Sequence, residues 1–228
     1  MKRLPTLKKT RVWHVGSPRA ARRKVVSSLE GTSFSVSEHP RAWTKIARLG
    51  GSSTVMLTRK DGKPGVFVNR HALSKDAENA LLAGSGLVTP TKVYVLREET
   101  SDENGDDTVL ESVFPTRAKA EEAADPDALE DGYATIVERD GWKATPELNR
   151  RWSQVFTGDL DMFAGEFAIM EAVEALGLYD GMWWKEDLDP WSLSAPRGGI
   201  FQSRLPAWGA VGAENSTYVE AVETWDEE

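Results

Sequence analysis

The chain has 228 residues and no cysteine, which excludes disulfide bonds, cysteine-based zinc sites and thiol nucleophiles. Its 40% apolar and 28% charged content is ordinary for a soluble globular protein, and its length suits one domain or one domain with a sizeable insertion. The net charge of −8 argues against broad binding to a phosphate backbone. No apolar run is long enough to cross a bilayer, and the basic start lacks the apolar centre of a signal peptide, so we expect a cytoplasmic protein without membrane contact.

Charge is distributed unevenly along the chain. Residues 1–24 hold nine lysines and arginines and no acidic residue, whereas acidic residues gather at 98–107 and at the C-terminal end. The basic segment is either a solvated face or a surface that meets a phosphate-bearing ligand.

The first third of the chain predicts strands followed by a helix. Residues 10–17 form an expected strand that ends at Gly16, and residues 32–37 alternate polar and apolar side chains, as a half-buried strand does. Ser37 is placed to cap a helix with Pro40 in its first turn, and Gly50-Gly51 ends that helix.

Three further elements follow. Residues 53–68 contain two runs of strand-forming residues around the turn sequence DGKPG, a pattern that predicts a hairpin. A short helix is expected over 72–83 and another strand over 92–98.

Residues 99–144 differ from the rest of the chain in composition and in the order of the expected elements. An acidic loop leads to a strand, to a helix with Thr116 as its N-cap, and to a second strand. We therefore expect three parts: 1–98 as one half of a core, 99–144 as an insertion or small subdomain that does not line the binding site, and 145–228 as the other half.

The last part predicts two helices and two strands. Thr145 caps a helix over 145–156, and Asp159 caps a longer one that ends at Gly177. The sequence YDGMWW then reads as a turn and a strand, and another strand follows around residue 198. The mixed order of helices and strands indicates the α+β class.

Four segments occur in an order typical of one family. They are WHVGS (13–17), SFSVSEHPRAW (33–43), GLYDGMWW (177–184) and SAPRGGIF (194–201). Together they resemble ADP-ribosyltransferases, in particular the histidine-bearing, diphtheria-toxin-like branch that includes many phage and bacterial effectors. The resemblance covers the N-terminal third and the last quarter of the chain, and residues 99–144 lie outside it. It implies a split β-sheet core with helices, into which the strand–helix–strand unit is inserted.

The resemblance implies NAD as the substrate and assigns roles in holding it. His14 would hydrogen-bond the ribose on the adenosine side, Gly16 would let the backbone approach the nicotinamide, and Ser17 would add a hydroxyl contact. The arginines that follow, Arg19, Arg22 and Arg23, are placed to meet the pyrophosphate.

The second motif strand and the late segment supply the other candidates. Ser35, with Ser33 and Ser37, would line the pocket, and Trp43 would cover a ring face. His14 and Asp180 are the candidate catalytic residues, with Asp180 as the carboxylate, although Asp180-Gly181 also reads as a tight turn.

The sequence departs from the family pattern at two places. The tyrosine usual near the second strand is absent, and the nearest aromatic residues are Phe34 and Trp43. Where the family carries a glutamate in the late strand, this chain has Arg197, with Gln202 a few residues later. Either the acid comes from elsewhere, with Asp180, Asp187 and Asp189 as the candidates, or the fold has lost transfer activity.

Two functions remain open. The first is an NAD-dependent transferase, carried by a phage or mobile element, that modifies a protein or a nucleic acid. The second is a noncatalytic binding or inhibitor protein on the same scaffold that holds a nucleotide or engages a basic partner through its acidic insert. His39 and His71 have no second ligand at metal spacing, so no metal site is expected. The oligomeric state stays open.

Overall fold

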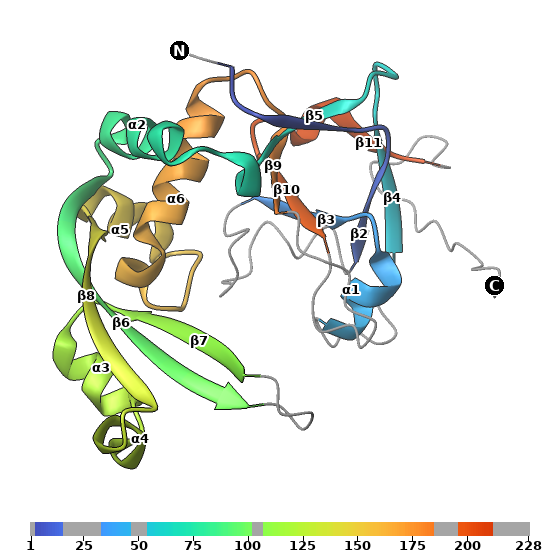
Figure 1. The fold of residues 1–228 in the computed structure, drawn as a ribbon. Coiled ribbons are helices and arrows are strands. Elements are labelled where there is room, and N and C mark those ends of the chain that lie inside the picture. The colour runs from blue at the N-terminus through green and yellow to red at the C-terminus, as the bar shows by residue number, and fades with distance from the viewer. Residues whose placement is uncertain (1–2, 16–32, 47–53, 102–106, 185–195, 212–228) are drawn as a thin grey trace.

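The computed structural model describes residues 3–15, 33–46, 54–101, 107–184 and 196–211. This part of the chain confirms the α+β class, with six α-helices, one mixed sheet of eight strands and one antiparallel sheet of three strands (Figure 1). The large sheet is built from β1 (Thr6–Lys9), β2 (Val12–Val15), β3 (Phe34–Ser37), β4 (Thr54–Arg59), β5 (Gly65–Asn69), β9 (Gly181–Trp184), β10 (Arg197–Ile200) and β11 (Trp208–Ala210).

The large sheet has the strand order β1-β5-β9-β10-β3-β2-β4-β11. All pairs of neighbouring strands in this sheet are antiparallel except β5 and β9, which run parallel. The sheet is curled, so that β11 at one end lies close to β5 near the other end. The ring centres of Trp208 and Phe67 are 5.9 Å apart. A side-chain carbon added to Gly65 would overlap the Trp208 ring.

An apolar cluster fills the inner face of this curled sheet. Its largest members are Phe34, Phe67, Trp183 and Trp208, from four different strands. Valine, leucine and isoleucine side chains from β2, β3, β4 and β10 complete it. Burial of this cluster accounts for the curl, since a flat sheet would leave these side chains in water.

Three helices and a larger apolar cluster cover the outer face at β5 and β9. The helices are α2 (Lys75–Ser85), α5 (Pro146–Trp152) and α6 (Leu160–Ala175). Trp152 of α5 stacks on Phe167 of α6 at 3.9 Å between ring centres. The predicted caps are confirmed: the side chains of Thr145 and Asp159 accept hydrogen bonds from the first-turn backbone of α5 and α6.

The second sheet forms the three-stranded unit, which packs against α6 through the start of β6 and the end of β8 and extends away from the large sheet (Figure 1). Its strands are β6 (Val88–Ser101), β7 (Asp107–Phe114) and β8 (Ala134–Ala144), with α3 (Arg117–Ala123) and α4 (Pro126–Glu130) between β7 and β8. The predicted N-cap Thr116 is confirmed. The strand expected at 92–98 belongs to β6, so the unit begins at Val88.

The hairpin predicted at 53–68 is wrong. β4 and β5 follow one another in the chain, but β4 pairs with β2 and β11, whereas β5 pairs with β1 and β9. The turn at Asp61–Gly62 forms, yet the two strands diverge after it. Leu57 of β4 and Phe67 of β5 nevertheless belong to the same inner cluster, although their strands lie near opposite ends of the sheet order.

The remaining described elements are short. They are α1 (Pro40–Ile46), directly after β3, and the one-turn 3₁₀ helices at Arg70–Ala72 and Leu205–Ala207. The predicted capping residue Ser37 accepts a hydrogen bond from the backbone N–H of His39, just before α1. The predicted end of this helix, at Gly50-Gly51, lies outside the described residues.

We predict that Gly181→Ala destabilises the fold by about 2 kcal/mol or more, because overpacking against fixed atoms has no cheap relief. An added side-chain carbon would lie 1.9 Å from the backbone oxygen of Gly199 on β10. Urea unfolding measures the loss. Gly84→Ala is the matched control, since a carbon there meets no atom within 4 Å and should leave stability equal or higher. Equal stability of the two variants would contradict the close approach of β9 and β10.

Candidate functional site

The four strands that carry the family-like motifs lie side by side, in the order β9-β10-β3-β2. Trp13 on β2 pairs with Ser37 on β3, and Ser37 pairs with Arg197 on β10. Paired residues of neighbouring strands point to the same face of a sheet. Segments separated by about 160 residues therefore form one row across the outer face.

His14 lies on the inner face of the sheet and is 6% exposed. Its ring is tilted against that of Phe34, with 4.1 Å between ring centres, and its Nδ1 is 2.8 Å from the backbone oxygen of Ser35. Because a carbonyl oxygen only accepts, Nδ1 carries the hydrogen of this bond. The imidazole is thereby held in one orientation at the edge of the inner cluster.

The serines of β3 point away from His14. Successive side chains of a strand alternate between faces, so Ser35 and Ser37 face outward while Phe34 and Val36 face inward. The Ser37 hydroxyl already has two hydrogen-bond partners: it donates to the backbone oxygen of Pro196 and accepts from the N–H of His39. Ser35 reaches His14 through its backbone only, so the structure does not bring these two side chains to one face.

Trp43 of α1 lies beside Arg197. The guanidinium carbon of Arg197 is 5.5 Å from the centre of the Trp43 ring, a cation–π distance. Arg197 and Trp43 are both half-buried. The outer face thus presents an arginine held against an aromatic ring.

Asp180 occupies a different place from His14. It is 3% exposed, and its two carboxylate oxygens accept hydrogen bonds from Arg59 Nη1 at 2.6 Å and from the backbone N–H of Val66 at 2.8 Å. The backbone N–H of Asp180 donates to the backbone oxygen of Val66, and the backbone oxygen of Asp180 accepts from the N–H of Phe201. The contacts of Asp180 join β4, β5 and the residue after β10, and none of them is with His14.

Arg59 is the residue that sequence reasoning missed. It lies at the end of β4 and binds both the exposed Asp61 and the buried Asp180. The hydrogen bond with Asp61 and the attraction of both carboxylates raise the pKa of Arg59. The same hydrogen bond, helped by the backbone N–H of Lys63, lowers the pKa of Asp61 to about 2. Nothing in the local sequence links Arg59 to a partner 121 positions later.

The remaining site predictions fall outside the described residues. Gly16, Ser17, Arg19, Arg22 and Arg23 lie there, and so do Asp187 and Asp189. Gln202 is half-buried, directly after Phe201.

A second cation–aromatic contact joins Lys9 of β1 and Trp183 of β9. Lys9 forms an ion pair with Glu38, and its ammonium group is 4.3 Å from the centre of the Trp183 ring. Lys9, which belongs to the basic N-terminal segment, therefore makes contacts within the fold. The described part of the chain contains no group of three or more histidine, aspartate and glutamate residues placed to hold a metal ion.

Compared with protein-family models, with curated proteins and with solved structures, the chain shows no significant match. No helix in the described ranges is long and apolar enough to span a membrane.

We predict that Asp180→Asn lowers the free energy of unfolding by about 2 kcal/mol, because it leaves the Arg59 cation without its buried partner; partial exposure of Arg59 keeps the loss below that of a fully buried pair. Chemical denaturation of both proteins at neutral pH tests this. Asp61→Asn removes the exposed partner of the same arginine and should cost much less. Similar losses for the two variants would refute a structural role for the buried carboxylate.

A pH dependence follows from Asp61. Its folded-state pKa of about 2 lies below the ordinary 3.8, so its bond with Arg59 stabilises the fold fully above about pH 4 and loses this effect as pH falls toward 2. The stability difference between the parent and Asp61→Asn should therefore shrink over that range. Urea unfolding at pH 5, 3.5 and 2.5 measures it, and a constant difference would exclude the lowered pKa.

Proposed function

We propose that this chain is an ADP-ribosyltransferase-like protein that uses NAD⁺ to modify a macromolecular acceptor, either a protein or a nucleic acid. In this proposal the large sheet is the split β-sheet core of that family, and the three-stranded unit is the insertion. The observation that carries the proposal is the adjacency of β2, β3 and β10. The family-like motifs are far apart in the sequence, and a shared ligand site requires them to meet.

The two faces of these strands offer different groups to NAD⁺. The inner face offers the fixed imidazole of His14. The outer face offers Arg197 beside Trp43, and a guanidinium group suits the pyrophosphate of a dinucleotide. We assign the ribose contact to His14 and phosphate binding to Arg197. Because these side chains belong to opposite faces, the nucleotide must pass over the ends of the motif strands.

The chemical step requires a carboxylate near the ribose, where positive charge develops as the glycosidic bond breaks. Asp180 is occupied by Arg59 and Val66, so in this proposal it is a structural residue. The carboxylate is then supplied by Asp187 or Asp189.

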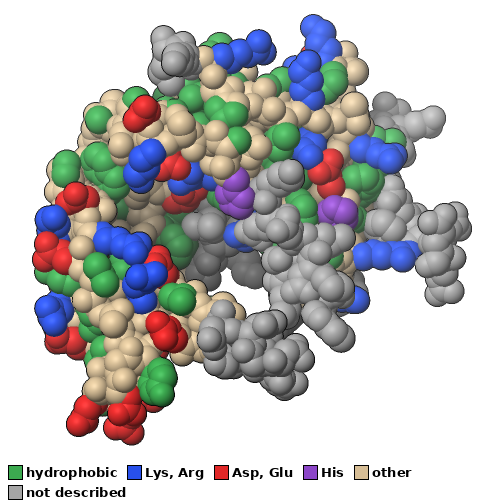
Figure 2. All heavy atoms as spheres, viewed as in Figure 1, with side chains coloured by type: hydrophobic (Ala, Val, Ile, Leu, Met, Phe, Trp, Pro, Cys, Tyr) green, Lys and Arg blue, Asp and Glu red, His purple; other side chains and the backbone are tan. Residues whose placement is uncertain are grey.

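A noncatalytic nucleotide-binding protein on the same scaffold is the second candidate. The engagement of Asp180 and the arginine at position 197 both favour it, since a guanidinium group cannot stabilise a developing cation. Its other form, in which an acidic insert engages a basic partner, draws less support from the described residues. Along the strands of the three-stranded unit the carboxylates of Glu111 and Asp140 are paired with Arg139 and Lys92, and acidic and basic side chains are mixed on its visible face, whereas the end of the unit at α4 is acidic (Figure 2).

We expect the purified protein to bind NAD⁺ saturably in calorimetric titration. His14→Phe keeps a ring against Phe34 but removes both nitrogens, and it should weaken binding about tenfold, which corresponds to about 1.4 kcal/mol, a typical cost for one lost hydrogen bond. His71→Phe, at an exposed histidine, is the control and should bind normally. Absence of NAD⁺ binding by the parent protein would remove the proposal in both forms.

Incubation with labelled NAD⁺ and a cell lysate then separates the two candidates. Transfer of label to protein or nucleic acid, abolished by Asp187→Asn or Asp189→Asn without loss of binding, supports the transferase. Binding without transfer supports the noncatalytic protein.

A further inference from the structure

A pocket of about 440 Å³ lies between α2 and α6, next to α5. Its volume is in the lower part of the range of ligand sites, about 300–1,000 Å³. It lies among the helices that cover β5 and β9, and none of the motif residues lines it.

Small side chains on the two facing helices create this space. Ala80 and Gly84 are four residues apart on α2, and Ala172 and Ala175 are three apart on α6. Such spacings place both residues of each pair on one side of their helix. Leu81 and Leu176 add larger apolar surface. The pocket therefore suits the apolar body of a ligand.

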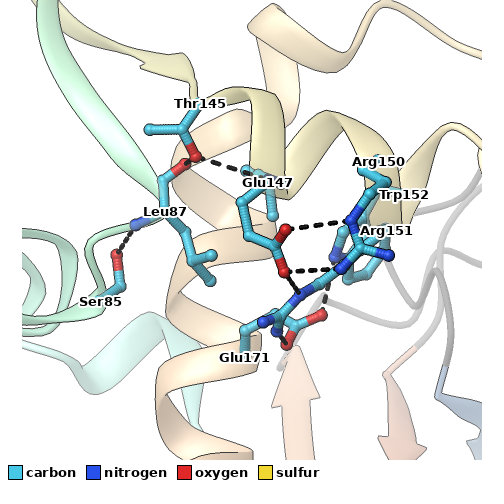
Figure 3. Close-up of polar contacts among 9 residues, drawn as sticks. Ser85, Leu87, Thr145, Glu147, Arg150, Arg151, Trp152 and Glu171 are labelled. Atoms are coloured by element: carbon cyan, nitrogen blue, oxygen red, sulfur yellow. Dashed lines mark hydrogen bonds and ion pairs between the residues drawn. The ribbon is translucent and has the colours of Figure 1, made fainter.

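Arg151 of α5 lines this pocket. Two carboxylates hold its side chain in place, as Figure 3 shows. Its Nε donates to Glu147 at 2.7 Å and its Nη1 to Glu171 at 2.9 Å. Glu171 is held in turn by the indole N–H of Trp152 at 3.0 Å. Hydrogen bonds from Arg150 and Arg151 lower the pKa of Glu147 to about 2, so Glu147 keeps its charge throughout the neutral range.

The other polar groups of the pocket are already satisfied. The Ser85 hydroxyl donates to the backbone oxygen of Leu82. It also accepts from the N–H of Leu87 (Figure 3). Glu171 accepts from two donors. Within the described ranges, by contrast, Nη2 of Arg151 donates no hydrogen bond. The polar capacity that remains is one guanidinium edge, and its natural counterpart is a carboxylate.

We propose that this pocket binds a small apolar monocarboxylate, with its hydrocarbon body between α2 and α6 and its carboxylate on Arg151. This site is separate from the motif strands and does not depend on the proposed NAD⁺ function. The sequence signals that mark it are the small residues at helical spacing and the arginine of α5.

Octanoate is the test ligand, with 1-octanol as its neutral counterpart. For a ligand of this size, we expect saturable binding of octanoate at about millimolar concentration, measured by NMR titration of the full-length protein. Arg151→Gln should weaken octanoate binding about tenfold or more and change octanol binding less than about twofold, because only the charged contact is lost.

Gly84→Leu tests the location. A side chain at this position starts in open space and fills the pocket, so binding of both ligands should disappear while the melting temperature does not fall. Gly84→Ala adds one methyl group and should retain binding. The proposal is overturned by any of three results: no saturation of the parent protein by octanoate, unchanged octanoate binding by Gly84→Leu, or equal weakening of octanoate and octanol by Arg151→Gln.

Discussion

The ion pair between Asp180 and Arg59 is the contact on which the geometry of the large sheet depends. Asp180 precedes β9 and Arg59 ends β4, and these strands are separated by three others in the sheet order. A flat sheet would hold them far apart, so the pair can form only when the sheet curls. The second oxygen of Asp180 binds the N–H of Val66, which fixes β5 at the same point. The inner cluster supplies the driving force for closure, and the carboxylate defines where closure occurs.

Local features of the fold were predictable from the sequence, because they depend on neighbouring residues. Thr116, Thr145 and Asp159 cap their helices as expected, since a capping oxygen needs only N–H groups two or three positions away. The hairpin prediction failed because strand pairing depends on residues that are distant in the sequence. A turn sequence fixes the turn, whereas strand partners are chosen by which long-range pairing buries more apolar surface.

The candidate site shows the same limit. The resemblance grouped His14 with the side chains of Ser35 and Trp43, whereas in the structure these two side chains lie on the face opposite to His14. Which face a strand residue occupies depends on the register with its neighbours, and that register is absent from a single sequence. Asp180 raised a related difficulty. A buried carboxylate in a YDG segment reads equally well as a catalytic group or as a turn, and its role became clear only from Arg59, which lies far away in the chain.

The base of the three-stranded unit has a consequence for how this protein can vary. Val88 at the start of β6 pairs directly with Ala144 at the end of β8. Thr145 donates to the Leu87 oxygen through both its N–H and its hydroxyl, and Figure 3 shows the hydroxyl bond. The chain therefore leaves the core and returns to it at one closed neck. Strands that extend from such a neck can lengthen or shorten by pairs of residues without shifting any residue of the core to the opposite face. The part of the three-stranded unit beyond Trp142, which is the last of its side chains to pack against the larger apolar cluster, can therefore change in length and surface while the large sheet keeps its register.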